Sequence, residues 1–288
     1  MNVRRWFPQP VRQAGREAYV RAASLTAPWR PLPDYLILGA ARAGSTSLYE
    51  YLGKHPSVMP ALVKEVHYFT GSFDRGEDWY RAHFPSAVRR RLTTALHGMA
   101  VTGEATPYYL FHPAAPARIH SLLPRVKLLA VLRDPVARAV SHYQHERRLG
   151  VEDLTMEDAI SREVDRTDAG DSPLAELLER DAGFAFRYQH FTYLARGRYA
   201  EQLQRYRELF PEDQLMVIRS EDLFEHGDDV YRSVLEFLGL RPYSLARYPR
   251  TNASRASKVD PAVQERLRAY FLPYNAQLEG LLGREMGW

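Results

Sequence analysis

The chain of 288 residues contains no cysteine. Disulfide bonds, catalysis by a thiolate and zinc sites built on cysteine are therefore excluded. The sequence also lacks an apolar run of the roughly 20 residues that a membrane-spanning helix needs, and its N-terminus lacks the apolar core of a signal peptide. We therefore expect a cytoplasmic protein. Hydrophobic residues make up 45% of the chain, which suits one large α/β domain or two small ones.

Positive charge is concentrated at the N-terminus. Residues 1–33 contain six arginines and one acidic residue, Glu17, whereas acidic and basic residues nearly balance over the rest of the chain. An arginine-rich segment with aromatic side chains can bind an anionic membrane surface or another polyanion. A solvated helix that packs its aromatics on the main domain is the favoured alternative. Because prolines cluster at the end of this segment, we predict a basic arm at 1–33 and a compact domain at 34–288.

Residues 35–54 have the pattern of a strand, a tight turn and a helix. An apolar stretch at 35–38 predicts a short buried strand, and apolar residues at helical spacing follow the turn. The amides of such a loop and the positive end of the helix dipole bind anions. We predict a phosphate-binding loop in which a guanidinium and three hydroxyls assist the amides; its residues are Arg42, Ala43, Gly44, Ser45, Thr46 and Ser47.

The absence of a lysine from this loop indicates which kind of phosphate compound it binds. A nucleoside-triphosphate loop carries lysine directly after its second glycine. Ser45 occupies that position here, and the cation lies three residues upstream at Arg42. This arrangement resembles the 5′-phosphosulfate loop of the sulfotransferases that use 3′-phosphoadenosine 5′-phosphosulfate (PAPS). A P-loop small-molecule kinase is the enzymatic alternative, and the absent lysine argues against it.

A second phosphate motif begins after residue 126. The apolar run 127–132 predicts a central parallel strand, and an Asp-Pro pair predicts the start of a helix directly after it. Arg133 therefore lies at the carboxyl end of a strand, where open α/β sheets bind ligands. Residues 132–143 resemble the 3′-phosphate motif of the same family, L-R-[DN]-P-x-x-R-x-x-S-x-[YF]. The resemblance implies that Arg133 and Ser141 bind the 3′-phosphate; a capped helix with a surface arginine is the plain alternative.

Residues 64–69, Lys-Glu-Val-His-Tyr-Phe, lie between the two phosphate motifs. They resemble the K-E-x-x-[FY]-F segment of the glycosaminoglycan-modifying sulfotransferases and related bacterial members. The resemblance implies that Glu65 is the catalytic base, a role that a carboxylate close to the acceptor can fill. It also implies that His67 borders the acceptor, although a histidine packed within the fold explains this residue equally well. The implied catalytic residues are thus Glu65, Arg42 and His67.

Two further segments depart from the family pattern. Residues 101–109 resemble the segment G-E-[KA]-[ST]-P-x-Y, in which many members carry an active-site lysine where this chain has Ala105. Lys64 could replace that cation. The polar basic loop 252–258 lies where family members close over the 3′-phosphate, but it lacks their K-G-x pattern. Its candidate donor-binding residues are Arg255 and Lys258.

Several features are interpreted as structural. His142 and His145 are three residues apart, and we expect solvated side chains there rather than a metal site. Residues 150–196 are expected to shape the acceptor pocket. Apolar spacing predicts a strand at 214–219 and helices near 156–164, 173–179, 230–238 and 261–282.

The resemblance extends from about residue 35 to the C-terminus. It implies a single three-layer α/β domain, a central parallel sheet flanked by helices, that transfers the sulfuryl group of PAPS to a hydroxyl or amine by in-line displacement. The acceptor would be a saccharide, lipid or small molecule, with a saccharide or glycoconjugate favoured, and neither a metal nor a nucleic acid is expected to take part. The alternative of a different class is a non-catalytic protein that binds polyanions or the membrane surface. We expect a cytoplasmic location, with peripheral membrane contact through residues 1–33 as a hypothesis.

Overall fold

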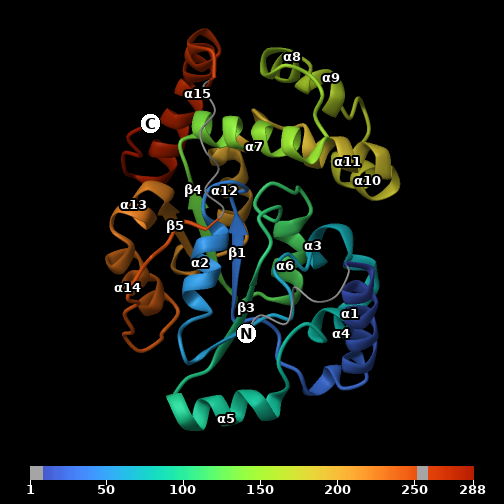
Figure 1. The fold of residues 1–288 in the computed structure, drawn as a ribbon, viewed down its shortest axis with the longest axis vertical. Helices are drawn as coiled ribbons and strands as arrows, with labels where there is room; N and C mark the ends of the chain where they lie inside the picture. Colours follow the sequence, from blue (N-terminus) through green and yellow to red (C-terminus); the bar gives the residue numbers. More distant parts are fainter. Residues whose placement is uncertain (1–8, 252–258) are drawn as a thin grey trace.

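The computed structural model describes residues 9–251 and 259–288. Its centre is a five-stranded parallel sheet in the order β2-β3-β1-β4-β5 (Figure 1). The strands are β1 (Tyr35–Gly39), β2 (Val58–Pro60), β3 (Val101–Ala105), β4 (Lys127–Leu132) and β5 (Leu215–Arg219). All of β1 and nearly all of β4 are buried, as expected of inner strands covered on both faces.

Helices make up most of the remaining chain. They are α1 (Gln9–Ser24), α2 (Ser45–Leu52), α3 (Tyr68–Gly71), α4 (Gly76–Arg81), α5 (Ala87–His97), α6 (Ala115–Leu122), α7 (Pro135–Leu149), α8 (Met156–Ser161), α9 (Glu163–Thr167), α10 (Leu174–Arg180), α11 (Ala182–His190), α12 (Tyr199–Arg207), α13 (Ser220–Glu225), α14 (Gly227–Phe237) and α15 (Pro261–Leu282). Short 3-10 turns are η2 (Ala27–Trp29), η3 (Phe73–Arg75), η4 (Ala195–Gly197) and η5 (Glu212–Gln214). Within the described ranges, no helix combines the length and the apolar character needed to cross a membrane.

The two faces of the sheet are covered by different helices. The crossovers from β1 to β2 and from β3 to β4 run in opposite directions along the sheet, so right-handed connections place α2 and α6 on opposite faces. α14 packs beside α2, where the Tyr231 hydroxyl donates to the Tyr51 carbonyl (3.2 Å). The chain that follows α12 lies beside α6, where the rings of His120 and Phe210 are 5.2 Å apart. The result is the three-layer α/β domain that the sequence predicts.

Most predicted elements are confirmed, and the differences have local causes. β2 was not predicted because it is a three-residue edge strand with little pattern to recognise. The helix predicted at 156–164 is divided into α8 and α9 at Arg162, which belongs to neither helix. The helix predicted at 230–238 begins earlier, at Gly227.

The described part of the N-terminal arm is a helix that packs on the main domain. Val20 and Ala23 of α1 contact Ala82 in a small apolar cluster. The packing was expected to involve aromatic residues, but Tyr19 and Trp29 are 47% and 70% exposed. For Tyr19 and Trp29 that expectation is wrong, because small aliphatic side chains of α1 fit closely on α4 while these two aromatics face solvent. The other aromatics of the arm, Trp6 and Phe7, lie outside the described residues.

Candidate active site

The carboxyl ends of β1 and β4 form the topological switch point of the sheet. These strands are neighbours, but the chain leaves β1 for α2 on one face and β4 for α7 on the other. Ligands of open α/β sheets bind in the crevice that such a divergence opens. Because one predicted phosphate motif follows β1 and the other follows β4, both motifs meet at this crevice (Figure 1).

The loop after β1 turns sharply into α2. Gly44 is the N-cap of α2 with a φ of 115°, and a Cβ at this position would approach the Phe224 ring to 3.0 Å. Glycine is therefore required by both the backbone conformation and the close packing. The first amides of α2 have no carbonyl partner within the helix, so they are available to an anion.

Arg42 and Arg133 lie together with Ser141 of α7. The Arg42 Nε donates to Ser141 Oγ at 3.2 Å, and the Arg133 guanidinium donates to the Arg42 carbonyl at 3.3 Å. Burial lowers the pKa of both arginines, and neighbouring cations lower it further, chiefly Arg148 for Arg42 and Arg250 for Arg133. Arginine stays charged at neutral pH. The two motifs thus form one joined positive site, which a bound anion would stabilise.

A cavity of about 410 Å³ occupies the crevice. The sequence-predicted residues that line it are Arg42, Gly44, Ser45, Thr46, Arg133 and Ser141. Ala43 and Ser47 are buried instead, and the Ser47 hydroxyl accepts a hydrogen bond from the Thr251 amide (3.0 Å). Arg255 and Lys258 lie outside the described residues.

Sequence reasoning missed two arginines of this cavity, Arg250 and Arg268. Arg250 packs over the Phe224 ring, 4.6 Å from its centre. It lies two residues before the start of the basic loop 252–258, and the positive charge of that loop could have drawn attention to it. Arg268 belongs to α15, and its sequence context resembles that of other surface arginines. Asp134 also lines the cavity, but its carboxylate is engaged as the cap of α7, where it accepts from the Val136 amide (2.8 Å).

Residues 64–69, the Glu65 segment, are hydrogen-bonded to the end of β3 and the residue that follows it. The three amides of residues 65–67 donate to acceptors on residues 104–106, namely the Ala105 carbonyl (3.0 Å), Glu104 Oε2 (3.3 Å) and Thr106 Oγ1 (3.4 Å). Glu65 and His67 have φ values of 64° and 58°. Such left-handed conformations cost non-glycine residues about 1–3 kcal/mol each and persist where surrounding contacts hold them.

Glu104 is fully buried and accepts four hydrogen bonds. Its Oε1 accepts from the hydroxyls of Tyr80 (2.7 Å) and Tyr109 (2.9 Å), and its Oε2 accepts from the Thr106 hydroxyl (2.8 Å) and the Val66 amide (3.3 Å). Burial raises the pKa of Glu104, and the four donors oppose that rise. This carboxylate, which sequence reasoning missed, ties the backbone of the Glu65 segment to the protein core.

The Glu65 carboxylate is ionised in this arrangement. Burial raises its pKa, but the hydrogen bond from His67 and the charge of Lys64 outweigh burial and bring the pKa to about 2. Lys64 Nζ contacts the carboxylate, and His67 Nε2 lies 3.7 Å from Glu65 Oε2. Lys64 is paired with Glu65 in this structure, and its replacement of the family's active-site lysine, where this chain has Ala105, stays a prediction. The Glu65 side chain is 45% exposed, and it is not among the described residues that line the 410 Å³ cavity.

A second cavity, of about 220 Å³, has His67 among its lining residues. Its polar and aromatic lining includes Tyr108, His112 and Gln189, and none of the described residues that line it is a lysine or arginine. Burial and then the neighbouring Arg118 lower the pKa of His112 to about 3, so this imidazole is neutral. α10 and α11, from the region expected to shape the acceptor pocket, supply part of the lining.

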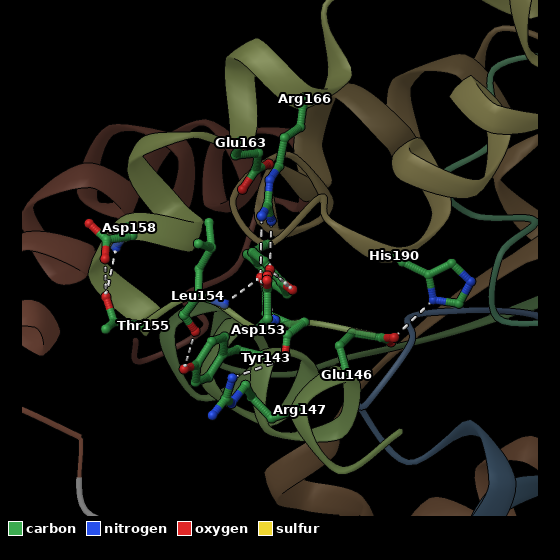
Figure 2. A network of polar contacts seen from close by, with 12 residues as sticks. Tyr143, Glu146, Arg147, Asp153, Leu154, Thr155, Asp158, Glu163, Arg166 and His190 are labelled. Atoms are coloured by element: carbon green, nitrogen blue, oxygen red, sulfur yellow. Dashed lines mark hydrogen bonds and ion pairs between the residues drawn. The ribbon is translucent and has the colours of Figure 1, made fainter. Parts of the chain in front are cut away.

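A histidine cluster on α7 corrects the prediction of solvated side chains. His142 is 3% exposed, and its Nε2 lies 3.3 Å from Glu146 Oε1. The other Glu146 oxygen pairs with His190 Nδ1 of α11 at 2.8 Å (Figure 2). Burial lowers the pKa of His142 to about 3. Burial raises the pKa of Glu146, but hydrogen bonds to the two histidines outweigh it and bring the pKa to about 2. In the described ranges, no three His, Cys, Asp or Glu side chains are grouped to hold a metal ion.

Comparison with known proteins identifies the family. The model of the sulfotransferase domain matches residues 32–267. The chain belongs to the sulfotransferase domain family. Members of this family are enzymes that use PAPS as sulfuryl donor, and the resemblance seen in the sequence motifs is confirmed.

Individual relatives agree with this assignment. A sulfotransferase from Alicyclobacillus acidocaldarius has a crystal structure that matches with a TM-score of 0.66 at 30% identity, over 88% of this chain and 97% of that one. The membrane-associated sulfotransferase kil1 of Dictyostelium discoideum is 24% identical over 89% of this chain. The mouse heparan sulfate glucosamine 3-O-sulfotransferase 6 is 26% identical over 90% of this chain. The matched regions span 66% and 74% of the lengths of these two relatives.

Proposed function

We propose that this sulfotransferase-family protein transfers the sulfuryl group of PAPS to a hydroxyl or amine of its acceptor. The observation that carries the proposal is the convergence of Arg42 and Arg133, from two separate phosphate motifs, on one cavity. PAPS carries anionic groups at both its 3′ and 5′ positions, so it needs cations at two places in one site. Arg250 and Arg268 add to the positive charge of the same cavity.

The donor-binding roles follow the two motifs. The amides at the start of α2, with the Ser45 and Thr46 hydroxyls, are assigned to the 5′-phosphosulfate. Arg133 and Ser141 are assigned to the 3′-phosphate, which a guanidinium can bind through two N–H donors. Arg42 is assigned to the sulfuryl oxygens and the departing 5′-phosphate, and its hydrogen bond to Ser141 keeps it beside the residues assigned to the 3′-phosphate. Because arginine stays protonated, Arg42 acts electrostatically, and removing such a donor typically lowers the rate by roughly 10²–10³.

The reaction is an in-line displacement at sulfur. The acceptor oxygen or nitrogen forms a bond to sulfur while the bond from sulfur to the 5′-phosphate oxygen breaks, and adenosine 3′,5′-bisphosphate leaves. Glu65 takes the acceptor proton. The hydrogen bond from His67 and the contact with Lys64 keep this carboxylate ionised but weakly basic, with a pKa of about 2. A bound anionic donor would compete for Lys64, and release of that cation would raise the pKa of Glu65 toward a value better suited to a base.

The second cavity is proposed to receive the acceptor. His67 lines this cavity, and its Nε2 lies 3.7 Å from Glu65 Oε2, so a hydroxyl bound beside His67 would lie near the base. Its described lining contains no lysine, arginine or carboxylate, which favours an uncharged, hydroxyl-bearing ring, and a saccharide or glycoconjugate fits this description. Incubation of radiolabelled PAPS with fractionated extract of the host cells would show which fraction takes the label.

Substitution of Glu65 by glutamine tests the function and the base together. Glu65→Gln should abolish sulfuryl transfer, because the amide cannot take a proton, while calorimetry should show nearly unchanged binding of adenosine 3′,5′-bisphosphate. Glu77→Gln is a matched control, since Glu77 is another glutamate paired with a cation (Arg81, 2.5 Å) and should leave transfer unchanged. Near-normal transfer by Glu65→Gln would show that another group is the base.

A P-loop kinase is less well supported by the same geometry. Ser45 stands where the triphosphate-binding lysine would be, and Asp134, the carboxylate in the cavity, is engaged as a helix cap. Titration with adenosine 3′,5′-bisphosphate and with ATP–Mg²⁺ separates the two functions. Tighter binding of ATP–Mg²⁺ would contradict the sulfotransferase proposal.

A further inference from the structure

Helix α5 turns its apolar side chains to solvent. Val88, Leu92 and Leu96 follow one another at four-residue intervals and are 66%, 61% and 77% exposed. Residues four apart lie on one face of a helix, so these three form a continuous strip, which we name the α5 stripe. None of the residues of α5 is buried. Apolar residues at this spacing ordinarily face the core, whereas the α5 stripe faces outward.

Contacts on the other side of α5 set this orientation. Arg90 pairs with Asp34 at 2.7 Å, and the second Asp34 oxygen accepts from the Thr102 amide of β3 at 2.8 Å. Asp34 directly precedes β1, so α5 is attached at the amino ends of two central strands. Figure 1 shows α5 at the lower end of the molecule, far from α7. The α5 stripe cannot turn inward without breaking the Arg90–Asp34 pair.

Arginines border the α5 stripe on both sides. At about 100° per residue, Arg89 lies about 100° to one side of Val88, and Arg91 about 60° to the other. Both arginines are exposed, and α5 itself contains no acidic residue. Among the described residues, no carboxylate forms an ion pair with either of them. An apolar stripe with cationic margins is typical of helices that lie in the interface of an anionic membrane.

We propose that α5 docks the protein on an anionic lipid bilayer. The α5 stripe enters the interfacial region, and Arg89 and Arg91 contact the lipid headgroups. Pairing of two copies through the same stripe is disfavoured, because a two-fold contact would bring the arginines of both helices together with no acidic residue on either helix. An anionic surface supplies the negative charge that this face lacks.

The turn after α1 adds a second apolar element at the same end of the molecule. Leu25 and Trp29 are 82% and 70% exposed. The adjacent Arg30 donates to the Phe84 carbonyl (2.6 Å), just before α5 begins, so the turn and the helix are held near each other. Tryptophan favours the membrane interface, which makes Trp29 a secondary contact of the docked state.

Docking through α5 leaves the active-site cavity directed away from the lipid. α5 lies at the amino ends of the strands, whereas Arg42 and Arg133 follow the carboxyl ends of β1 and β4 (Figure 1). An acceptor would therefore reach the cavity from the aqueous side. The membrane contact would localise the enzyme rather than present a lipid to it.

Co-sedimentation of the full chain with vesicles tests this proposal. Phosphatidylcholine vesicles provide a neutral surface, and equal parts of phosphatidylcholine and phosphatidylglycerol provide an anionic one. We expect binding to the anionic vesicles that weakens as salt is added. Leu92→Ser/Leu96→Ser should reduce this binding at least about tenfold, because both side chains lose apolar contact. The control Leu272→Ser, at a leucine of α15 that is 67% exposed, should leave binding unchanged.

The charge contribution is tested by Arg89→Gln/Arg91→Gln. This variant should bind anionic vesicles roughly tenfold more weakly and should retain the wild-type unfolding midpoint, since both side chains are exposed. The proposal would be overturned by no binding of the full chain to anionic vesicles, by wild-type binding of the double serine variant, or by a dimer that this variant dissociates. Binding that depends on residues 1–30 and not on α5 would overturn it in favour of the basic arm.

Discussion

Replacement of Glu104 by glutamine tests how the core holds the Glu65 segment. Each Glu104 oxygen accepts two hydrogen bonds, from Tyr80 and Tyr109 at Oε1 and from Thr106 and the Val66 amide at Oε2. Glutamine has one acceptor oxygen, so its NH₂ group must face one of the two pairs. The better orientation keeps the oxygen toward the Val66 amide, which cannot rotate, and turns the NH₂ group toward the two tyrosines.

The magnitude follows from the two donors that lose their acceptor. Tyr80 and Tyr109 are fully buried, so their hydroxyl hydrogens cannot bond to water instead. A buried unsatisfied donor costs about 1–3 kcal/mol, and we expect Glu104→Gln to lower the free energy of unfolding by roughly 2–6 kcal/mol. The retained bond to the Val66 amide should preserve much of the transfer rate per folded molecule. Glu104→Ala, which frees that amide, should lose transfer activity as well.

Urea unfolding followed by circular dichroism measures the effect, with an unchanged slope indicating a change in stability alone. Tyr80→Phe is the control, because it removes one hydroxyl without leaving a donor unsatisfied. In the double variant Glu104→Gln/Tyr80→Phe one of the two unsatisfied donors is absent, so its loss of stability should be smaller than the sum of the single losses. Additive losses, or a glutamine variant within about 0.5 kcal/mol of the wild type, would refute this account.

Three further predictions concern the donor loop and the buried charges. Arg133→Ala should weaken binding of adenosine 3′,5′-bisphosphate roughly 10–100-fold in calorimetry, since hydrogen bonds to charged groups contribute about 1.5–3 kcal/mol; unchanged affinity would remove Arg133 from the donor site. Gly44→Ala should lower both donor binding and the unfolding midpoint, because the new Cβ meets Phe224 at 3.0 Å at a φ of 115°; a wild-type midpoint would contradict the strain. The pKa of His142 is about 3 against an ordinary 6.5, and that of Glu146 is about 2 against an ordinary 4.5. As the pH falls, the unfolded chain therefore binds more protons at these two residues than the folded chain does. The stability that they contribute at neutral pH is lost between about pH 6.5 and pH 2. Unfolding midpoints should fall less steeply with acidification in Glu146→Gln, and parallel curves would show that Glu146 does not contribute.

The two motifs that line the 410 Å³ cavity were largely predictable because each motif is local in the sequence. The strand, turn and helix around Gly44 are consecutive in the chain, and Arg133 stands between an apolar strand and an Asp-Pro helix start. The sequence also indicated that both motifs follow strands of one parallel sheet. It did not reveal that Arg42 would contact Ser141, which joins the two motifs into one site.

The sequence by itself determined the strands at 35–38, 127–132 and 214–219, the two phosphate motifs and the family, since each depends on residues close together in the chain. Only the tertiary structure decided the burial of His142 against Glu146, the four donors around Glu104 and the outward direction of the α5 stripe. The physical reason is that burial and pairing depend on residues brought from distant parts of the chain. Apolar spacing identifies which face of a helix is hydrophobic, but the neighbouring elements decide whether that face is buried within the protein.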